Sequence, residues 1–246
     1  MNVNHNLFAA LRAGFPADLD ACAIETADAD ANAYALRYTW RDLELATAKI
    51  ANLLASLDLP AGSRIAVQTE KSVEALMLYL AVLRAGLVYL PLNTAYQAAE
   101  VEYFITNAEP AVVVCSGRNF GWFSKLAFKA GTAHVFTVNE DRTGSLLQRA
   151  AHHSDQHTPA VKSADDMAAI LYTSGTTGRS KGAMLSHGNL LNNARMLHSY
   201  WGWQQGDVLI HALPIFHVHG LFVASHGALL NGSKMIWFSQ DRKSVV

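Results

Sequence analysis

The chain has 246 residues, of which 51% are hydrophobic, and its 19 Lys and Arg residues nearly balance 20 Asp and Glu residues. This composition is typical of a globular protein of roughly one or two domains that can bury a core. A formal net charge of -1 gives no positive field for a polyanion, so we expect small-molecule ligands and no nucleic acid partner. The two cysteines, Cys22 and Cys115, are too few for a disulfide framework, and we expect both to be buried apolar side chains.

Neither a targeting segment nor a membrane span is predicted. Among the first fifteen residues, Arg12 is the only Lys or Arg, which is unlike a secretory signal or a transit peptide. The most apolar stretch, residues 75–83, is much shorter than the ~20 residues that cross a bilayer. We therefore expect a cytoplasmic protein.

Helices and short apolar strands alternate along the first part of the chain. Apolar residues at helical spacing, with Thr39 as a plausible N-cap, predict a helix over residues 38–54. A mostly buried helix is expected over 72–85, ended by Gly86, and another over 98–108. Short β-branched or apolar runs predict strands at 64–70, 87–93 and 111–115.

The segment 152–166 is polar and has no periodicity, so we interpret it as a linker between a first α/β part, residues 1–151, and a second, residues 167–240. After the linker, Ser186 is expected to cap a helix. Leu190, Ala194, Leu197 and Trp201 would share one face of it. A further helix is expected over 220–231, and strands over 167–173, 182–186, 208–214 and 234–238. The alternation predicts the α/β class, with mostly parallel sheets flanked by helices.

A loop rich in glycine and hydroxyl side chains, TSGTTGRSKG, follows the predicted strand 167–173. Its glycines let main-chain N–H groups approach a ligand closely, and its hydroxyls and lysine add donors and a positive charge. The candidate phosphate ligands are Thr173, Ser174, Gly175, Thr176, Thr177, Gly178 and Lys181. The alternative is a flexible hairpin loop without a ligand.

The loop does not match the Walker phosphate-binding pattern. Counted from Gly175, Ser180 stands where the second glycine belongs and Gly182 where a Ser or Thr belongs. Instead, TSGTTGRSKG closely resembles the phosphate-binding signature of the AMP-forming acyl-CoA synthetases, within the adenylate-forming superfamily. Members of that family usually carry Pro where this chain has Ser180.

The resemblance extends along most of the chain, because further segments occur in the family's order. They are YTWRDL, GSRIAV, AVLRAGLVYLPLNTAY, LSHGNL and LPIFHVHGLF. The resemblance implies an AMP-forming acid-thiol ligase that uses ATP, Mg²⁺, CoA and a small carboxylic acid. It implies that residues 173–178 and Lys181 bind ATP, that Thr176 helps to hold Mg²⁺, and that Lys181 and His217 are catalytic. His217 would lie where the acyl group meets the α-phosphate.

The histidine segment LPIFHVHGLF most resembles the malonyl-CoA synthetases, which implies malonate as the acid. A second carboxylate in the acyl pocket would need a cation, ideally arginine, yet residues 205–241 contain none. His217 and His219 form an H-x-H that could instead belong to a zinc site. A ligase for another short or medium acid, a carrier-loading adenylation module, and a non-enzymatic nucleotide-binding or metal-binding protein also remain open.

The family continues beyond the point where this chain stops, with an adenine-binding segment, an acidic Mg²⁺ ligand, a ribose-binding aspartate and a C-terminal domain. The resemblance therefore implies that residues 1–246 are a fragment of one AMP-binding domain and inactive alone. The ending DRKSVV, residues 241–246, can be encoded by a common sequencing-adapter sequence. We expect it to be an artefact, which the coding DNA would test.

Overall fold

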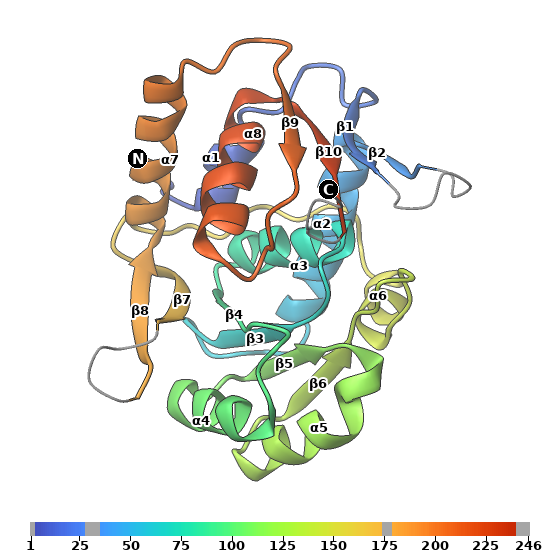
Figure 1. Ribbon diagram of the computed structural model, residues 1–246, viewed down its shortest axis with the longest axis vertical. Helices are drawn as coiled ribbons and strands as arrows, with labels where there is room; N and C mark the ends of the chain where they lie inside the picture. The colour runs from blue at the N-terminus through green and yellow to red at the C-terminus, as the bar shows by residue number, and fades with distance from the viewer. Residues whose placement is uncertain (1–2, 28–34, 174–178, 240–246) are drawn as a thin grey trace, which may run out of the picture.

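The computed structural model describes residues 3–27, 35–173 and 179–239, which form two sheets with helices around and between them (Figure 1). The loop residues 174–178 and the suspected tail 241–246 lie outside this description. Within the described part, no helix is long and apolar enough to cross a membrane.

The larger sheet has six strands in the order β6-β5-β3-β4-β7-β8. Every neighbouring pair is parallel except β7 with β8. Its strands are β3 (Arg64–Gln68), β4 (Val88–Pro91), β5 (Val112–Cys115), β6 (His134–Thr137), β7 (Met167–Thr173) and β8 (Lys181–Ser186). The predicted α/β class with mostly parallel strands is confirmed.

The smaller sheet has four strands in the order β2-β1-β10-β9. Its strands are β1 (Cys22–Thr26), β2 (Arg37–Thr39), β9 (Val208–His211) and β10 (Lys234–Trp237). β1 runs parallel to β10, which pairs in parallel with β9, while β1 and β2 are antiparallel. Because β1 pairs with β10 and β4 with β7, the parts on either side of segment 152–166 contribute strands to both sheets.

The helical elements are α1 (Leu7–Arg12), α2 (Trp40–Ala55), α3 (Val73–Arg84), α4 (Ala98–Ala108), α5 (Phe120–Lys129), α6 (Ser145–Ala150), α7 (His187–Trp201), α8 (Ser225–Asn231), a 3₁₀ turn (Gly117–Asn119) and a π-helix (His219–Ala224). Helices α2 and α3 lie on one side of the large sheet, and α4 and α5 lie on the other. Along β3, Ile65 and Val67 join the core that contains α2 and α3, whereas Ala66 faces the core of α4 and α5. This alternation is expected of a parallel strand that is covered on both sides.

Two predicted helices owe their ends to local signals. Thr39 caps α2 through a reciprocal capping box, in which its Oγ1 accepts from the Asp42 N–H at 3.0 Å and Asp42 accepts from the Thr39 N–H at 2.7 Å. All twelve residues of α3 are buried, because this helix lies at the centre of the molecule (Figure 1). Gly86 follows it with φ of 73°, a left-handed conformation that favours glycine.

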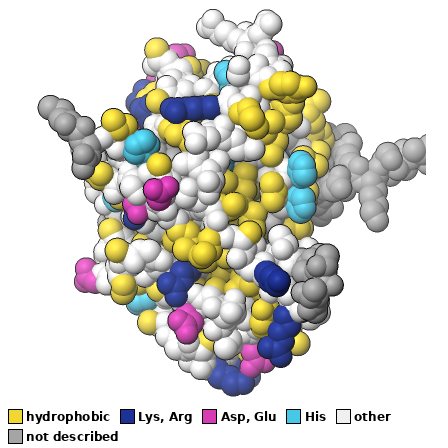
Figure 2. Space-filling model, turned by 90° about the vertical axis from the view of Figure 1, so that its left-hand side faces the viewer, with side chains coloured by type: hydrophobic (Ala, Val, Ile, Leu, Met, Phe, Trp, Pro, Cys, Tyr) yellow, Lys and Arg dark blue, Asp and Glu magenta, His cyan; other side chains and the backbone are white. Residues whose placement is uncertain are grey.

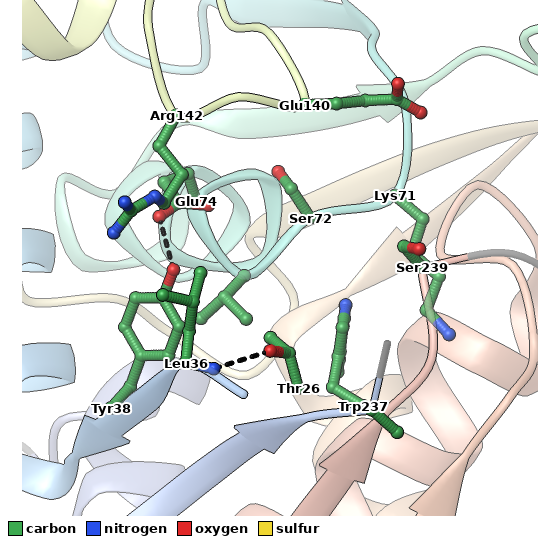
Figure 3. Close-up of a pocket in the computed structure, with 12 residues that line it drawn as sticks. Thr26, Leu36, Tyr38, Lys71, Ser72, Glu74, Glu140, Arg142, Trp237 and Ser239 are labelled. Atoms are coloured by element: carbon green, nitrogen blue, oxygen red, sulfur yellow. Dashed lines mark hydrogen bonds between the residues drawn. The ribbon is translucent and has the colours of Figure 1, made fainter. Parts of the chain in front are cut away.

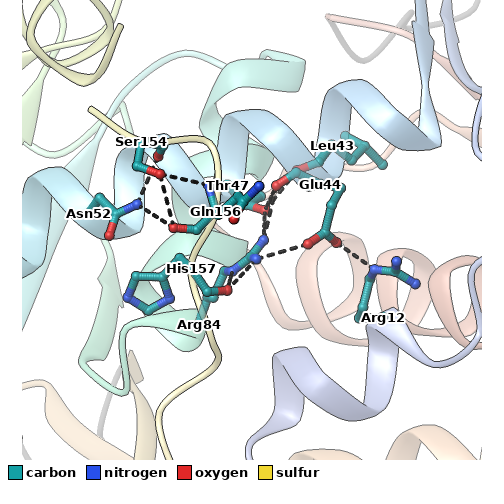
Figure 4. A network of polar contacts seen from close by, with 9 residues as sticks. All are labelled: Arg12, Leu43, Glu44, Thr47, Asn52, Arg84, Ser154, Gln156 and His157. Carbon is teal, nitrogen blue, oxygen red and sulfur yellow. Dashed lines mark hydrogen bonds and ion pairs between the residues drawn. The ribbon is translucent and has the colours of Figure 1, made fainter. Parts of the chain in front are cut away.

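The segment 152–166 has no helix or strand, but hydrogen bonds hold it against α2 and α3 (Figure 4). The Arg84 side chain is the centre of this network: its Nε donates to the His157 carbonyl at 3.0 Å, and its Nη1 donates to Thr47 Oγ1 at 3.0 Å. Its Nη2 also donates to Glu44 Oε1 at 2.8 Å. Asn52 on α2 donates to the carbonyls of residues 154 and 156. Side-chain hydrogen bonds from α2 and α3 therefore hold this segment against the core.

Two expectations need correction, and a third is confirmed with a difference in helix type. The segment 220–231 is helical and ends at Asn231 as predicted, but its first part, His219–Ala224, is a π-helix followed by α8. Trp201 does not share the buried face of α7, because it is 54% exposed at the last helical residue. Cys115 is buried as expected, but Cys22, the first residue of β1, is only partly buried.

Candidate nucleotide-binding site

The strands that precede and follow the candidate phosphate loop, β7 and β8, pair as an antiparallel hairpin (Figure 1). Thr173 and Lys181 are paired residues in this hairpin, so the two ends of the loop lie side by side. Both residues are exposed, as a contact with a soluble ligand requires. Ser174, Gly175, Thr176, Thr177 and Gly178 lie outside the described residues, and their roles stay predictions.

Helix α4 contacts the C-terminal end of the loop, residues 179 and 180. The Tyr103 hydroxyl donates to the carbonyl of Ser180 at 2.8 Å, and the Arg179 guanidinium lies over the Tyr103 ring, 5.8 Å from its centroid. Tyr172 donates to Asn107 Oδ1 at 2.5 Å, and burial raises the pKa of Tyr172. The two contacts of Tyr103 hold residues 179 and 180, directly before Lys181. They also give Ser180, at the position where the family usually has Pro, a role through its main chain.

His217 lies on the segment that connects β9 to the π-helix. The rings of His217 and His219 are exposed and stacked, with centroids 5.4 Å apart and an interplanar angle of 11°. The His219 N–H points to His217 Nδ1 at 3.4 Å. Histidine and hydrophobic side chains lie next to each other on the face shown in Figure 2. His217 is therefore accessible to a ligand, as its predicted role requires.

Buried contacts of His211, Gly220 and Ser225 fix the segment that carries His217. His211 Nε2 lies 3.0 Å from both the Gly220 carbonyl and Ser225 Oγ, and the Ser225 hydroxyl donates to the same carbonyl at 2.9 Å. Burial, with a smaller contribution from the Lys71 charge, lowers the pKa of His211 to about 4. A Cβ on Gly220 would lie 2.1 Å from the Pro214 carbonyl oxygen. Only glycine therefore allows this close approach.

Sequence reasoning missed this cluster, and it also missed a second pair beneath it. The Tyr79 hydroxyl on α3 lies 2.7 Å from His226 Nε2 on α8. Burial lowers the pKa of His226 to about 3. The available signal was the occurrence of histidines within apolar runs. That pattern equally indicates histidines that only pack in the core. The structure makes His211 and His226 internal supports of the segment that bears His217.

His187, the first residue of α7, is also structural. Its Nδ1 accepts the Leu7 N–H at 3.0 Å, and burial lowers its pKa to about 4. Ser186 and Asn189 form a capping box for α7, which confirms the predicted cap.

The described residues contain no group of three or more His, Cys, Asp or Glu side chains able to hold a metal ion. The H-x-H pair thus lacks a third protein ligand within that part of the chain, whereas zinc sites use at least three. Mg²⁺ differs, because it commonly takes one or two protein ligands together with substrate phosphates and water. A hydroxyl such as Thr176 would suit that arrangement.

The AMP-binding enzyme family matches residues 19–245. The chain belongs to this family. AMP-binding enzymes of known structure share its fold: apo MatB from Rhodopseudomonas palustris is 49% identical, with a TM-score of 0.89 over 97% of this chain and 46% of MatB. A structure of ATP-bound MatB from the same organism is 50% identical over the same shares.

Curated relatives within the AMP-binding family are CoA ligases. An oxalate–CoA ligase of Arabidopsis thaliana is 30% identical over 184 residues, covering 74% of this chain and 36% of the relative. A malonate–CoA ligase of the same plant is 30% identical over 164 residues, covering 66% and 27%. The chain thus spans about a third of these curated relatives and about half of MatB.

Proposed function

We propose that this chain supplies the phosphate-binding part of an AMP-forming acid–CoA ligase that activates malonate. The observation that carries the proposal is the similarity to CoA ligases named for malonate and oxalate, which are both short dicarboxylic acids. The loop sequence and the accessible His217 support the same reaction. Oxalate is the second candidate, since the oxalate relative covers the larger share of this chain.

The reaction has two steps. A carboxylate oxygen of the acid attacks the α-phosphorus of ATP, and the bond between the α-phosphorus and its bridging oxygen breaks to release pyrophosphate. The CoA thiol then loses its proton and attacks the acyl carbonyl, and AMP leaves with the electron pair of the acyl–oxygen bond. Malonate would thus give malonyl-adenylate and then malonyl-CoA.

In this proposal, Lys181 and the donors of residues 173–178 hold the β- and γ-phosphates of ATP. Each hydrogen bond to a charged group contributes about 1.5–3 kcal/mol, so several such bonds suffice for useful affinity. His217 orients the carboxylate toward the α-phosphorus, which is catalysis by positioning. Mg²⁺, with Thr176 as one ligand, would neutralise phosphate charge when bound.

The acid specificity can be tested by joining this chain to the remaining part of MatB and measuring pyrophosphate release. The panel would contain malonate, oxalate, acetate and octanoate. We expect the highest kcat/KM with malonate. A preference for acetate or octanoate would contradict the dicarboxylate assignment, while a preference for oxalate would select the second candidate.

The 246-residue chain alone is proposed to bind ATP without completing adenylation. Pyrophosphate release from ATP and malonate by the purified chain would overturn this part of the proposal. A His217→Ala exchange in the joined protein separates positioning from binding, because we expect a lower kcat with little change in the KM for ATP.

A further inference from the structure

A pocket of about 200 Å³ lies outside the candidate nucleotide site, between the carboxyl ends of β1 and β10 and the first turn of α3 (Figure 3). Thr26 and Trp237 line it from the sheet, and Lys71, Ser72 and Glu74 line it from the helix side. Neither the hairpin residues of the phosphate loop nor the stacked histidines contribute to its wall. Its volume is well above the ~10–15 Å³ that holds one water molecule.

The pocket contains an unpaired buried donor. Trp237 is 1% exposed, and its Nε1 has no hydrogen-bond partner among the described residues. In Figure 3 the indole nitrogen points into the pocket. A buried polar group without a partner is destabilising, because it has given up its hydrogen bonds to water. The indole N–H therefore favours a pocket occupant that carries a hydrogen-bond acceptor.

Two positive features lie beside this donor. The Lys71 ammonium is 4.6 Å from the centroid of the Trp237 ring and also donates to the His211 carbonyl at 2.8 Å. The amino end of α3 starts at the pocket wall with Ser72 as N-cap, and the partial positive charge of a helix N-terminus favours anions. Arg142 contributes a further cation to the lining.

Two carboxylates oppose these charges. Glu74 is 8% exposed and accepts the Tyr38 hydroxyl at 2.7 Å. Glu140 also lines the pocket, but in Figure 3 its carboxylate points away from Trp237. The anionic side of the pocket is thus Glu74, on the side where Tyr38 lies, while Trp237 and Lys71 form the other side.

We propose that this pocket binds a small oxyanion, either a carboxylate or a phosphate, which accepts the Trp237 indole N–H between Lys71 and the amino end of α3. The site is separate from the phosphate loop, and the proposal does not depend on the adenylation function. The anion is bound without chemical change.

The test is an NMR titration of the ¹⁵N-labelled chain with sodium phosphate and, separately, with sodium acetate, at an ionic strength kept constant with sodium chloride. Five tryptophans give five indole N–H signals, and the Trp237→Phe variant assigns one of them. We expect the Trp237 signal to move saturably with at least one anion. The anion that binds more tightly identifies the source as phosphate or carboxylate.

Equilibrium dialysis of the labelled anion would compare the affinities of the parent chain and of matched variants. Trp237→Phe keeps an aromatic ring but removes the donor, and we expect about tenfold weaker binding, since a hydrogen bond to a charged group contributes about 1.5 kcal/mol or more. Glu74→Gln removes a like charge and should strengthen binding. The control is Trp122→Phe, whose indole N–H already donates to Asn119 at 3.3 Å, with unchanged affinity.

Three results would overturn the proposal. The first is a Trp237 signal that stays in place up to saturating phosphate and acetate. The second is a Trp237→Phe variant that binds as tightly as the parent chain. The third is a Trp237 shift that grows linearly with anion concentration and shows no saturation, because that outcome means there is no defined binding site.

Discussion

Three buried histidines are neutral in the folded protein at pH 7. Burial lowers the pKa to about 4 for His187 and His211 and to about 3 for His226. Each uses one ring nitrogen in a hydrogen bond. The second ring nitrogen of each is buried without a partner among the described residues, so protonation would place an unpaired charge inside the protein.

These histidines predict a loss of stability in acid. Their folded-state pKa values lie below the unfolded value of about 6.5, so between those limits the unfolded chain binds more protons than the folded chain. The free energy of unfolding should therefore be highest above pH 6.5 and fall as the pH is lowered toward 4. Each histidine contributes a slope of up to about 1.4 kcal/mol per pH unit.

Urea unfolding at several pH values would measure this slope. We expect His226→Gln to reduce it, because one titrating group is removed. The control is Leu221→Val at a fully buried position, which should lower the stability equally at every pH. An unchanged slope in His226→Gln would contradict the prediction.

A second residue-scale prediction concerns Lys181. Replacing it with Met keeps the exposed stem but removes the charge, and we expect ATP to bind at least about tenfold more weakly, as expected for the loss of a charge-assisted hydrogen bond. Calorimetric titration of the purified chain with ATP would measure this. Lys129→Met is the control, because that exposed lysine pairs with Glu102 on the helix layer. Equal ATP affinities in both variants would contradict a role for Lys181 in ATP binding.

At the scale of elements, the π-helix His219–Ala224 is the unusual feature. π-helical turns are rare in proteins, but those that occur are often found at functional sites. Its second residue, Gly220, lies against the Pro214 carbonyl, and its own carbonyl accepts from Ser225. The two histidines that stack on the surface are thus joined directly to a tightly packed turn.

The variant Gly220→Ala tests this packing. The new Cβ would meet the backbone of Pro214, which has no flexible end to move away, so we expect a loss of about 2–3 kcal/mol, within the range for overpacking. Gly121→Ala is the control, because nothing lies within 4 Å of a Cβ at that helical position. It should be neutral or slightly stabilising. Thermal unfolding of both variants would decide between these outcomes.

The elements that the sequence predicted are those with local signals. The capping residue Thr39 fixed the start of α2, and the apolar run 167–173 matched β7 residue for residue. By contrast, β1 has five residues and pairs with a strand some 210 positions away, so nothing near it in the sequence announces a sheet. The π-helix was missed because its apolar residues continue without a break into α8.

The same distinction applies to the candidate site. The glycines, hydroxyls and lysine of the loop are contiguous, so their residue types alone indicated phosphate binding. The support from Tyr103 comes from 77 positions before Ser180, and His211 meets Ser225 only through the π-helical turn. Such contacts depend on tertiary packing, which composition and periodicity do not specify.

At the scale of the whole molecule, large apolar side chains are exposed on several elements of the second half of the chain. They are Met184, Met196, Tyr200, Trp201, Val208, Ile210, Leu213 and Val218. β8 and β9 are the terminal strands of their sheets in the described structure. Exposed apolar patches and open strand edges both promote association.

We therefore expect the isolated chain to self-associate at micromolar concentration. Ile210→Lys places a charge on the β9 edge, where the side chain is 69% exposed, and should shift the chain toward the monomer. Light scattering coupled to gel filtration would measure this. The control is Val3→Lys, at a residue that is 71% exposed but far from β9 in the sequence. Equal masses for both variants would count against the β9 edge as the contact.

The pairing of β1 with β10 also sets the timing of folding on the ribosome. Ile24 lies opposite Met235, so β1 leaves the ribosome long before its parallel partner is made. At roughly 5–20 residues per second, translation of the intervening residues takes on the order of 10–40 s. During this interval the edge of β1 has no neighbour on that side, and a chaperone that binds extended strands would find its substrate in the nascent chain.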